Sequence, residues 1–501
     1  MVKESLLKES KILRVVHRLS QKRKRKVYLV GGAVRDLFLE RSLGRDFDFV
    51  ARGEVVELAK DVAQEVGGTA FPLDEAFGTW RVIIKKSKKK TELDFSLMQG
   101  KDILEDLRQR DFTANSIAVN LNDVFHPGEL RFIDPLNGLN DIQERVLRAN
   151  SEESLRQDPL RMLRAFRFSS TLGLSVEEET LRMIQRNRDR VLRSAWERIR
   201  SEFFAGLGEM RAGGFLKDLH ESGLLEVIFP EVRGWESFDQ GTHLPLFEHA
   251  VRTVEAGEII FAHLQELYPS YAKLLDHHFS STIEEGILRV ALFKFAAFLH
   301  DSGKPATVSL SPDGLSVRFL DHDQEGQKIN RLIAQRMKLS RKAVRIISEL
   351  TRQHMRILSL ANTKEVTSRA EYRFFRDLGK EGIDVIFLTF ADGLASTPIT
   401  LGWPLIQDLP SGLKKIKEVA EELLRYYFEE FLPKPPRPLL DGREIMRALG
   451  IPPGEEVGRL LGRLREAEIA GRVRTAQEAW EFLKNIDSSR PFGYYKKKKH
   501  N

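Results

Sequence analysis

The sequence of 501 residues contains no cysteine. This absence excludes a disulfide-stapled secreted scaffold, a cysteine-ligated zinc or iron–sulfur centre, and catalysis by a thiol. Any metal that the protein binds must therefore be held by histidine, aspartate or glutamate. The sequence also lacks a run of about 18 apolar residues, so we expect no membrane span.

No sign of charge dominates either. The 80 lysines and arginines nearly balance 73 aspartates and glutamates, which leaves a net charge of +7. This small excess does not by itself require a nucleic-acid partner. The basic residues do gather in three clusters, around Lys22–Lys26, Lys85–Lys90 and Lys496–Lys499. Such clusters suit contacts with phosphate groups, and the alternative interpretation is a solvated surface or a frayed tail.

Targeting signals are also missing. Over residues 1–20, apolar positions recur at helical spacing, with Glu4 and Glu9 among them. A secretory signal requires a continuous apolar stretch and a transit peptide avoids acidic residues, so both are excluded. We expect one amphipathic helix here and a cytoplasmic protein.

Hydrophobic periodicity divides the chain into a mixed part and a helical part. Short or alternating apolar runs predict strands at 27–30, 47–50, 81–85, 92–97, 116–121 and 130–133. Beyond about residue 140, the 3.6-residue period predicts helices, including 155–172, 177–191, 196–207 and 215–225. The fold class is therefore expected to be α+β.

We expect four parts along the chain. They are an α/β head over 1–140, a helical neck over 141–205, a helical body over 206–405 and a helical C-terminal tail over 406–501. A turn is predicted at Pro312–Gly314, and a proline-rich linker is predicted at Pro433, Pro435, Pro436 and Pro438.

Two motifs in the head carry the chemistry of a nucleotide site. Gly31 and Gly32 follow an apolar strand, and paired glycines allow backbone N–H groups to approach a phosphate chain. Asp46 and Asp48 are two residues apart on a predicted strand, so both carboxylates point to one side. A divalent cation such as Mg²⁺ relieves their repulsion and bridges substrate phosphates. Asp94 is a third candidate catalytic carboxylate, although a solvated edge strand would also explain the aspartates.

The motifs of the head resemble those of a known family. The segment LVGGAVRD at 29–36, followed by DFD at 46–48, is similar to the opening signature of class II tRNA nucleotidyltransferases and bacterial poly(A) polymerases. These enzymes have a polymerase-β-like nucleotidyltransferase head. The resemblance continues in order through RDFTAN at 110–115, DPLNGLND at 134–141 and ERIRSE at 197–202, with Gln109 where the family usually has arginine.

The resemblance implies roles for individual residues. Asp46 and Asp48 would hold Mg²⁺. The triphosphate would be bound by Gly31, Gly32 and Arg110, and the ribose would be contacted by Asp111. The same resemblance places three more residues at the nucleotide: Arg35, Asn115 and Arg164.

The segment QDPLR at 157–161 resembles the motif with which the family reads the incoming base. On one helix, Asp158 and Arg161 would lie at i and i+3 and share a face. Arg161 can donate to the ring nitrogen of cytosine or adenine while Asp158 accepts from the exocyclic amine. Uracil and guanine present the opposite pattern and would be rejected. Without the other motifs, an exposed ion pair would be the simpler interpretation.

The segment between the strand predicted at 92–97 and Arg110 is short. Enzymes that add the complete CCA carry a flexible loop here, and its loss resembles the CC-adding specialists. We therefore expect a Mg²⁺-dependent, template-independent enzyme that adds C residues from CTP to tRNA lacking its 3′ CCA. Full CCA addition, A addition from ATP and poly(A) synthesis are the alternatives within this class.

The body resembles an HD phosphohydrolase domain. The resemblance rests on His249 and on the HDSGKP segment at 300–305, and implies that a second divalent metal is held by His249, His300, Asp301, His322 and Asp392, with His354 as a further candidate. Imidazole and carboxylate together suit a metal that activates water against a phosphate ester. A metal-dependent phosphohydrolase is therefore the alternative from another class, and an RNA-binding protein with an inactive head is a third.

The C-terminal module, from Leu439 to about residue 485, resembles the end segment of the family. Its basic character suits a folded RNA, and a helical cap on the body is an equal alternative. Tyr494 and Tyr495 beside the last lysines could stack on RNA bases.

Overall fold

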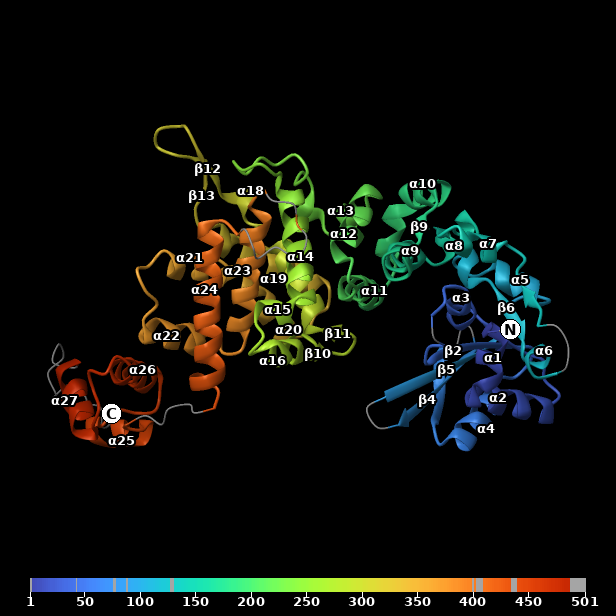
Figure 1. The fold of residues 1–501 in the computed structure, drawn as a ribbon, viewed down its shortest axis with the longest axis horizontal. Coiled ribbons are helices and arrows are strands. Elements are labelled where there is room, and N and C mark those ends of the chain that lie inside the picture. The colour runs from blue at the N-terminus through green and yellow to red at the C-terminus, as the bar shows by residue number, and fades with distance from the viewer. Residues whose placement is uncertain are drawn as a thin grey trace, which may run out of the picture. The chain divides into compact units, whose positions relative to one another are not determined.

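The computed structural model describes residues 2–41, 43–74, 78–86, 89–126, 130–398, 401, 409–433 and 439–486. The chain forms two compact units, Met1–Pro230 and Glu231–Asn501, which are described separately (Figure 1). Within this division, the four parts expected from the sequence remain a prediction. Several predicted features lie outside the described residues: Pro435, Pro436 and Pro438 of the linker, Lys88, and the tail with Tyr494, Tyr495 and Lys496–Lys499.

The N-terminal segment forms two helices, α1 (Val2–Glu9) and α2 (Lys11–Lys22), instead of the single helix expected. Ser10 separates them because its backbone is extended and its Oγ accepts a hydrogen bond from the Leu13 N–H at 3.3 Å. Serine in this position satisfies a backbone donor at the start of a helix and so favours a new helix over a continuous one.

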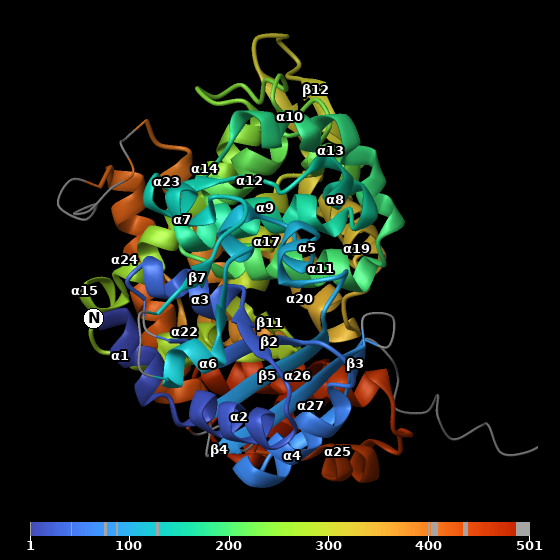
Figure 2. The same cartoon turned by 90° about the vertical axis from the view of Figure 1, so that its right-hand side faces the viewer.

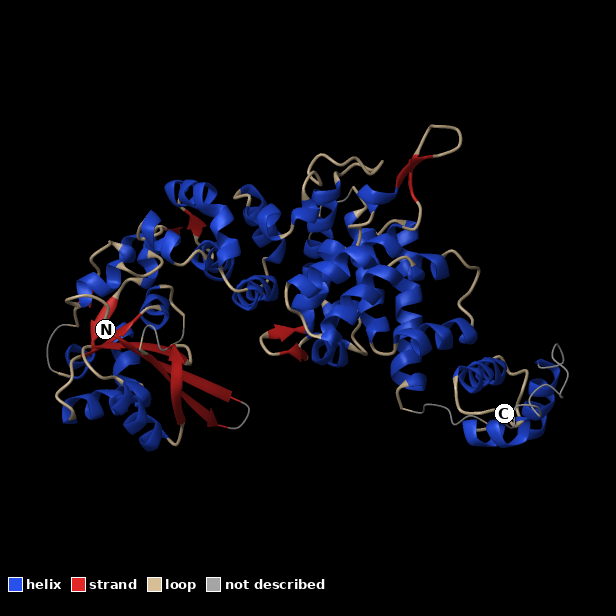
Figure 3. Ribbon diagram, turned by 180° about the vertical axis from the view of Figure 1, so that it is seen from behind, coloured by secondary structure: helices blue, strands red, loops and turns tan. Residues whose placement is uncertain are grey.

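A seven-stranded sheet forms the centre of the head, with the order β3-β4-β5-β2-β1-β6-β7. Its strands are β1 (Val27–Val30), β2 (Asp46–Ala51), β3 (Thr69–Asp74), β4 (Thr79–Lys86), β5 (Lys89–Leu97), β6 (Ala118–Asn120) and β7 (Phe132–Ile133). All neighbours pair antiparallel except β2 and β5, which are parallel. Figure 3 shows that this sheet holds most of the strands.

The two faces of the sheet differ. The head helices are α3 (Gly32–Phe38), α4 (Val56–Val66), α5 (Ile103–Arg108), η1 (Thr113–Asn115), α6 (Leu121–Phe125) and α7 (Gly138–Gln143). Helix α4 packs against β3 and β4, and α2 packs on α4 (Figure 2). Phe49 and Phe95 stack on this face at 5.0 Å. On the other face, Val30 and Val50 pack with Ile103 of α5, and this is the face to which Asp46 and Asp48 belong.

The neck follows the sheet and is almost entirely helical. Its elements are β8 (Val146–Leu147), α8 (Glu152–Gln157), α9 (Leu160–Leu172), β9 (Ser175–Val176), α10 (Glu178–Asn187), η2 (Arg188–Arg193) and α11 (Trp196–Gly208). Two further helices of the first unit follow it, α12 (Ala212–Glu221) and α13 (Leu224–Ile228). Helix α9 packs against α11 and α12.

One expectation for the neck was wrong. The single helix predicted over 155–172 is broken between α8 and α9. Asp158 has extended backbone angles, φ −129° and ψ 92°, because a residue that precedes proline is sterically pushed away from helical geometry. Asp158 and Arg161 therefore do not share a helical face at i and i+3. Asp158 instead stands just before α9, on which Arg161 lies.

The second unit is an assembly of helices with two β-hairpins. Its elements after η3 (Pro230–Val232) are α14 (Leu246–Ala262), α15 (Leu264–Leu267), α16 (Ala272–Phe279), β10 (Thr282–Glu284), β11 (Ile287–Leu288), α17 (Arg289–Leu299), α18 (Lys304–Thr307), β12 (Val308–Leu310), β13 (Val317–Phe319), α19 (His322–Arg336), α20 (Arg341–Gln353), α21 (Arg356–Ala361), α22 (Ser368–Leu378), α23 (Glu381–Ala395), α24 (Ser411–Arg425) and the π-helix η4 (Tyr426–Phe431). The predicted turn at Pro312–Gly314 lies between β12 and β13.

The C-terminal module consists of α25 (Gly442–Leu449), α26 (Glu455–Ile469) and α27 (Ala476–Ile486) around a small core of its own. Three arginines of α22, namely Arg369, Arg373 and Arg376, bind the buried carboxylate of Glu466 on α26. In the described part of the chain, no helix is long and apolar enough to cross a membrane.

Candidate active site

The three carboxylates predicted in the head lie on adjacent parallel strands. Asp46 and Asp48 alternate with the buried Phe47 on β2, and Asp48 pairs in register with Asp94 on β5. The alternation of a strand directs all three side chains to the same face of the sheet.

Acidic side chains lie close together on this face of the sheet. Burial raises the pKa of Asp48, and Asp94 raises it further against the opposing effect of Arg110. Burial and the neighbouring Glu92 likewise raise the pKa of Asp46, although Arg81 opposes them. A cation placed between these carboxylates would relieve the repulsion, so the residues present fit a divalent metal with oxygen ligands.

Asp94 differs from the other two carboxylates because it already has a partner. Arg81 on the neighbouring strand β4 donates to both of its oxygens, from Nε at 2.8 Å and from Nη2 at 2.7 Å. A bidentate pair of this kind is among the stronger ion pairs in proteins. Asp94 thus belongs to the acidic cluster by position, but its charge is largely neutralised.

Gly31 lies directly against the carboxylate of Asp48. Its φ is +70°, and a Cβ at this position would come within 2.9 Å of Asp48 Oδ2 and 3.7 Å of Arg110 Nη1. A side chain would therefore be both strained and obstructed. Gly32 is the first residue of α3, and Gly31 before it brings the backbone close to Asp48 and Arg110.

Four further predicted residues form one internal network. Asp111 Oδ2 accepts hydrogen bonds from Arg164 Nε at 3.1 Å and Nη2 at 2.8 Å, and Oδ1 accepts one from Asn115 at 3.1 Å. Arg35 is buried and donates to Asn115 Oδ1 at 2.7 Å. Although burial opposes the change, Arg164 and Asn115 lower the pKa of Asp111. The network fixes an ionised Asp111, and Arg35 acts on it through Asn115.

A cavity of 970 Å³ lies on the neck side of the carboxylates. Arg110 reaches it from the head, and Ser96 borders it two residues beyond Asp94 on the same face of β5. Its charged lining consists of five arginines and two aspartates: Arg110, Arg156, Arg161, Arg193, Arg198, Asp106 and Asp158. This lining has a net positive charge, which favours a polyphosphate anion.

The cavity brings together the two residues predicted to read a base. Asp158 and Arg161 both line it. The Asp158 Oδ2 accepts from Arg198 Nη2 at 3.0 Å, and Arg161 Nη1 donates to the Gln109 carbonyl at 2.9 Å. Sequence reasoning did not assign Arg198 a role, although it lies within the matching ERIRSE segment, because its proximity to Asp158 depends on how α11 packs in the neck.

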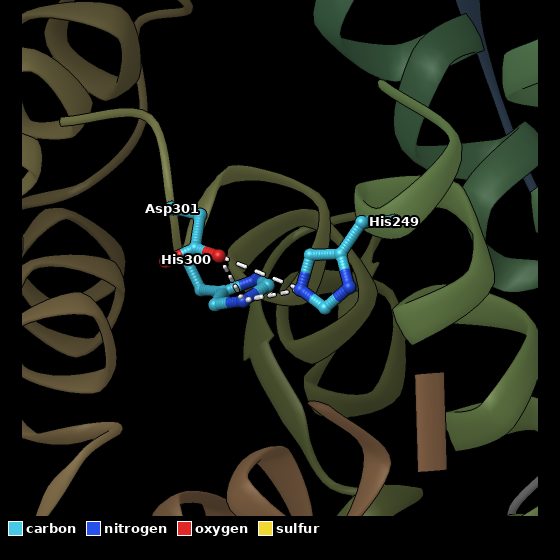
Figure 4. A group of neighbouring side chains, drawn as sticks. All are labelled: His249, His300 and Asp301. Carbon is cyan, nitrogen blue, oxygen red and sulfur yellow. Dashed lines mark hydrogen bonds and ion pairs between the residues drawn. The ribbon is translucent and has the colours of Figure 1, made fainter. Parts of the chain in front are cut away.

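A second candidate site lies in the other unit, where helix ends bring together His249, His300 and Asp301. His249 is on α14, whereas His300 and Asp301 directly follow α17. The three side chains point toward one another (Figure 4), with Asp301 Oδ2 at 3.4 Å from His249 Nε2 and 3.1 Å from His300 Nε2. Asp392 Oδ1 of α23 is 3.2 Å from His249 Nε2.

Asp301 also belongs to a second group. Its other oxygen, Oδ1, is 3.4 Å from His322 Nε2 and 3.7 Å from His354 Nε2. Each group of three has its potential ligand atoms within 4.8 Å of one another. The structure thus gathers the other four predicted residues and His354 around Asp301, whose two oxygens face the two groups.

The histidine rings are oriented for binding a cation. The Nδ1 atoms of His300, His322 and His354 lie 2.8, 2.8 and 2.7 Å from backbone carbonyls, which places the proton on Nδ1. Their Nε2 lone pairs then face the cluster, where His300 Nε2 is 3.4 Å from His249 Nε2. Without a cation, Asp301 and Asp392 instead raise the pKa of His300 to about 10 even though burial opposes this change.

Comparison with known proteins places these sites in families. Residues 27–148 match the poly(A) polymerase head domain, and residues 173–235 match the probable RNA- and SrmB-binding site of polymerase A. Residues 246–395 match the HD domain.

Two curated relatives extend the match to nearly the whole chain. The A-adding tRNA nucleotidyltransferase of Deinococcus radiodurans is 33% identical over 92% of this chain and 96% of its own length. The CC-adding tRNA nucleotidyltransferase of Thermus thermophilus is also 33% identical, over 91% of this chain and 92% of its own. The chain belongs to the tRNA nucleotidyltransferase family.

The family resemblance expected from the sequence is therefore confirmed, and the protein is a nucleotidyltransferase of the CCA-adding family. A solved structure of a CCA-adding enzyme in its apo form covers 94% of this chain and 93% of its own, with a TM-score of 0.62 and 21% identity. The complex of the Thermotoga maritima CCA-adding enzyme with tRNA has a TM-score of 0.58, 20% identity and coverage of 95% and 94%. These likenesses confirm the expected fold of the tRNA nucleotidyltransferase: a polymerase-β-like head and a helical body.

Proposed function

We propose that this tRNA nucleotidyltransferase adds C residues from CTP to tRNA that lacks its 3′ CCA, with Mg²⁺ at Asp46 and Asp48. The observation that carries the proposal is the cavity lined by Arg110, Asp158 and Arg161, in which Arg110 also interacts electrostatically with Asp48. It combines groups for a triphosphate with groups for a base, and both sets belong to the protein itself. Such a site needs no nucleic-acid template.

The reaction joins the tRNA to the nucleotide through one displacement. The 3′-hydroxyl oxygen attacks the α-phosphate, the bond to the β-phosphate breaks, and pyrophosphate leaves. Mg²⁺ would stabilise the attacking and leaving oxygens. The protein mainly positions the reactants: Arg110, with the backbone at Gly31 and Gly32, binds the triphosphate, and Asp111 receives the ribose hydroxyl.

Base choice follows from hydrogen-bond complementarity. Arg161 donates to the ring-nitrogen acceptor of cytosine and Asp158 accepts from its amine, whereas uracil would face Asp158 with a carbonyl oxygen. The restriction to CTP is supported by the connection between β5 and α5, which consists of Met98–Asp102 only. Relatives named for A addition and for CC addition are equally identical to this chain, so identity does not decide between them.

One assay tests this proposal. The full chain is incubated with each NTP singly and with tRNAs that lack CCA, end in C, or end in CC. We expect two additions from CTP to the first tRNA, one to the second, and no A on the third. Efficient A addition would contradict the CC restriction, and long A tails on unrelated RNA would indicate a poly(A) polymerase.

The histidine cluster favours a second function, that of a metal-dependent phosphohydrolase. Asp301 presents one oxygen to His249 and His300 and the other to His322 and His354, an arrangement that fits two divalent ions. Imidazole and carboxylate ligands suit transition metals, which would activate water there. The test is the metal content of the purified full chain and its hydrolysis of p-nitrophenyl phosphate esters. A metal-free chain that stays inactive after addition of Mn²⁺, Ni²⁺ or Zn²⁺ would contradict this function.

A further inference from the structure

The two residues proposed to read the base are tied to different elements. Asp158 is fixed to the neck helix α11 through the ion pair with Arg198 at 3.0 Å, and its Oδ1 is 3.3 Å from the Leu160 N–H. Arg161 is fixed to the head through the carbonyl of Gln109, the residue that directly follows α5. The side chains that would read the base are therefore held by hydrogen bonds to two different elements.

Where these side chains are held matters because cytosine and adenine differ in size but not in pattern. Both present a ring-nitrogen acceptor beside an exocyclic amine, so the same pair of residues complements either base. In adenine this edge lies farther from the sugar, because the six-membered ring is attached through the imidazole ring. A site that holds the sugar in one place must move Asp158 and Arg161 outward to read adenine.

We propose that Arg198 is a positioning residue that restricts the cavity to cytosine by holding Asp158 against α11. The inference rests on the proposed function, since it assumes that Asp158 and Arg161 read the base. Arg198 leaves lone pairs of Asp158 available for the cytosine amine, because an ionised carboxylate accepts at about four sites. What it removes is the freedom of Asp158 to move outward with a larger base.

Because Arg198 is exposed, its proposed role can be tested by mutation. Its side chain is 56% exposed, so its replacement leaves the packed core of the neck intact. Arg193 supplies a matched control because it is another arginine that lines the same cavity, whereas the ion pair with Asp158 belongs to Arg198. Removing either arginine removes the same charge, but only one removal releases Asp158.

The experiment compares Arg198→Ala, Arg198→Lys and Arg193→Ala in the full chain. The kcat and KM for CTP are measured with tRNA that lacks CCA, and those for ATP and UTP with tRNA that ends in CC. In Arg198→Ala we expect kcat/KM for ATP relative to CTP to rise about fivefold, the scale of an exposed ion pair, mainly through the KM of ATP. UTP stays excluded because its edge still mismatches both residues. Arg198→Lys restores most of the discrimination, and Arg193→Ala lowers the use of CTP and ATP by the same factor.

The other possible outcomes distinguish a failure of the role inferred for Arg198 from a failure of the proposed function. A uniform loss with all nucleotides in Arg198→Ala would show a merely structural role and overturn the inference. A parallel rise of ATP and UTP would overturn it as well, because Arg198 would then govern the hydrogen-bond pattern and not the size of the base. If the unmodified enzyme already adds A efficiently to tRNA ending in CC, or does not use CTP, the proposed function fails first and the inference falls with it.

Discussion

The two candidate metal sites of this chain differ in how completely the protein surrounds the ion. In the head, Asp46 and Asp48 stand on strand β2, and Arg110 links Asp48 to an open cavity of 970 Å³. In the helical unit, four histidines and two aspartates converge from five helices or their ends, and His300 is completely buried. The first site offers two free carboxylates, whereas the second offers a nearly closed set of ligands.

This difference follows from the secondary structure that carries the ligands. A strand sends only alternate residues to one face, so β2 supplies two carboxylates and leaves the remaining positions to substrate oxygens. Helix ends can be directed at a common point from several sides, and they bring backbone carbonyls that orient the histidine rings. The head site therefore depends on its substrate for completion, while the histidine cluster is complete without one.

Replacing Asp48 by asparagine is the strongest test of this difference between the head site and the histidine cluster. Because the head has few ligands to spare, Asp48→Asn is expected to reduce transfer from CTP by about a thousandfold or more. The metal content of the histidine cluster should not change. Single-turnover transfer to tRNA lacking CCA and elemental analysis of the same preparation measure both effects.

The control for this variant is Asp61→Asn. Asp61 lies on α4 and pairs with Arg23 away from the carboxylate face, so transfer should stay at the level of the unmodified enzyme. If Asp48→Asn retains more than about a tenth of the activity, Asp48 does not hold the metal in the way proposed.

Disrupting the closed site should have the reverse effect. His300→Gln is expected to weaken metal binding at the cluster at least about a hundredfold, since it removes a ligand outright, while transfer from CTP continues. Glutamine is used because it fills much of the buried volume. Elemental analysis after dialysis against a chelator measures the result, with the exposed His277→Gln as the control. Equal metal retention in both variants would show that the cluster is not a metal site.

The sequence predicts the residues of both candidate sites, but it predicts their arrangement better in the head than in the histidine cluster. Asp46 and Asp48 could be paired from local alternation alone, because their strand needs no knowledge of its partners. Strand β3 was not predicted, since Pro72 lies within it and proline is tolerated mainly on an edge strand, the place that β3 occupies. The break before α9 is caused by Pro159, but it was not predicted because periodic apolar residues on both sides of the proline indicate one continuous helix.

Contacts between distant segments could not be predicted. The Arg198–Asp158 ion pair joins residues that are 40 positions apart, and it exists only because α11 packs beside the start of α9. The role of Asp301 as the centre of two ligand groups likewise depends on five helices meeting at one point. Motif spacing identifies the ligands in such a site but contains no information about which oxygen faces which histidine.

The smallest expected effect concerns Asp94, which lies beside Asp48 but is paired. Because Arg81 already neutralises both of its oxygens, Asp94→Asn should lower transfer by no more than about tenfold, the scale of one charge-assisted hydrogen bond. The Mg²⁺ concentration for half-maximal activity should remain near that of the unmodified enzyme. If Asp94→Asn is instead as damaging as Asp48→Asn and needs much more Mg²⁺, Asp94 must leave Arg81 and become a ligand when the nucleotide binds. The head site would then gain a third protein ligand, but only when the nucleotide binds. It would differ from the histidine cluster in when its ligands assemble and not in how many the protein supplies.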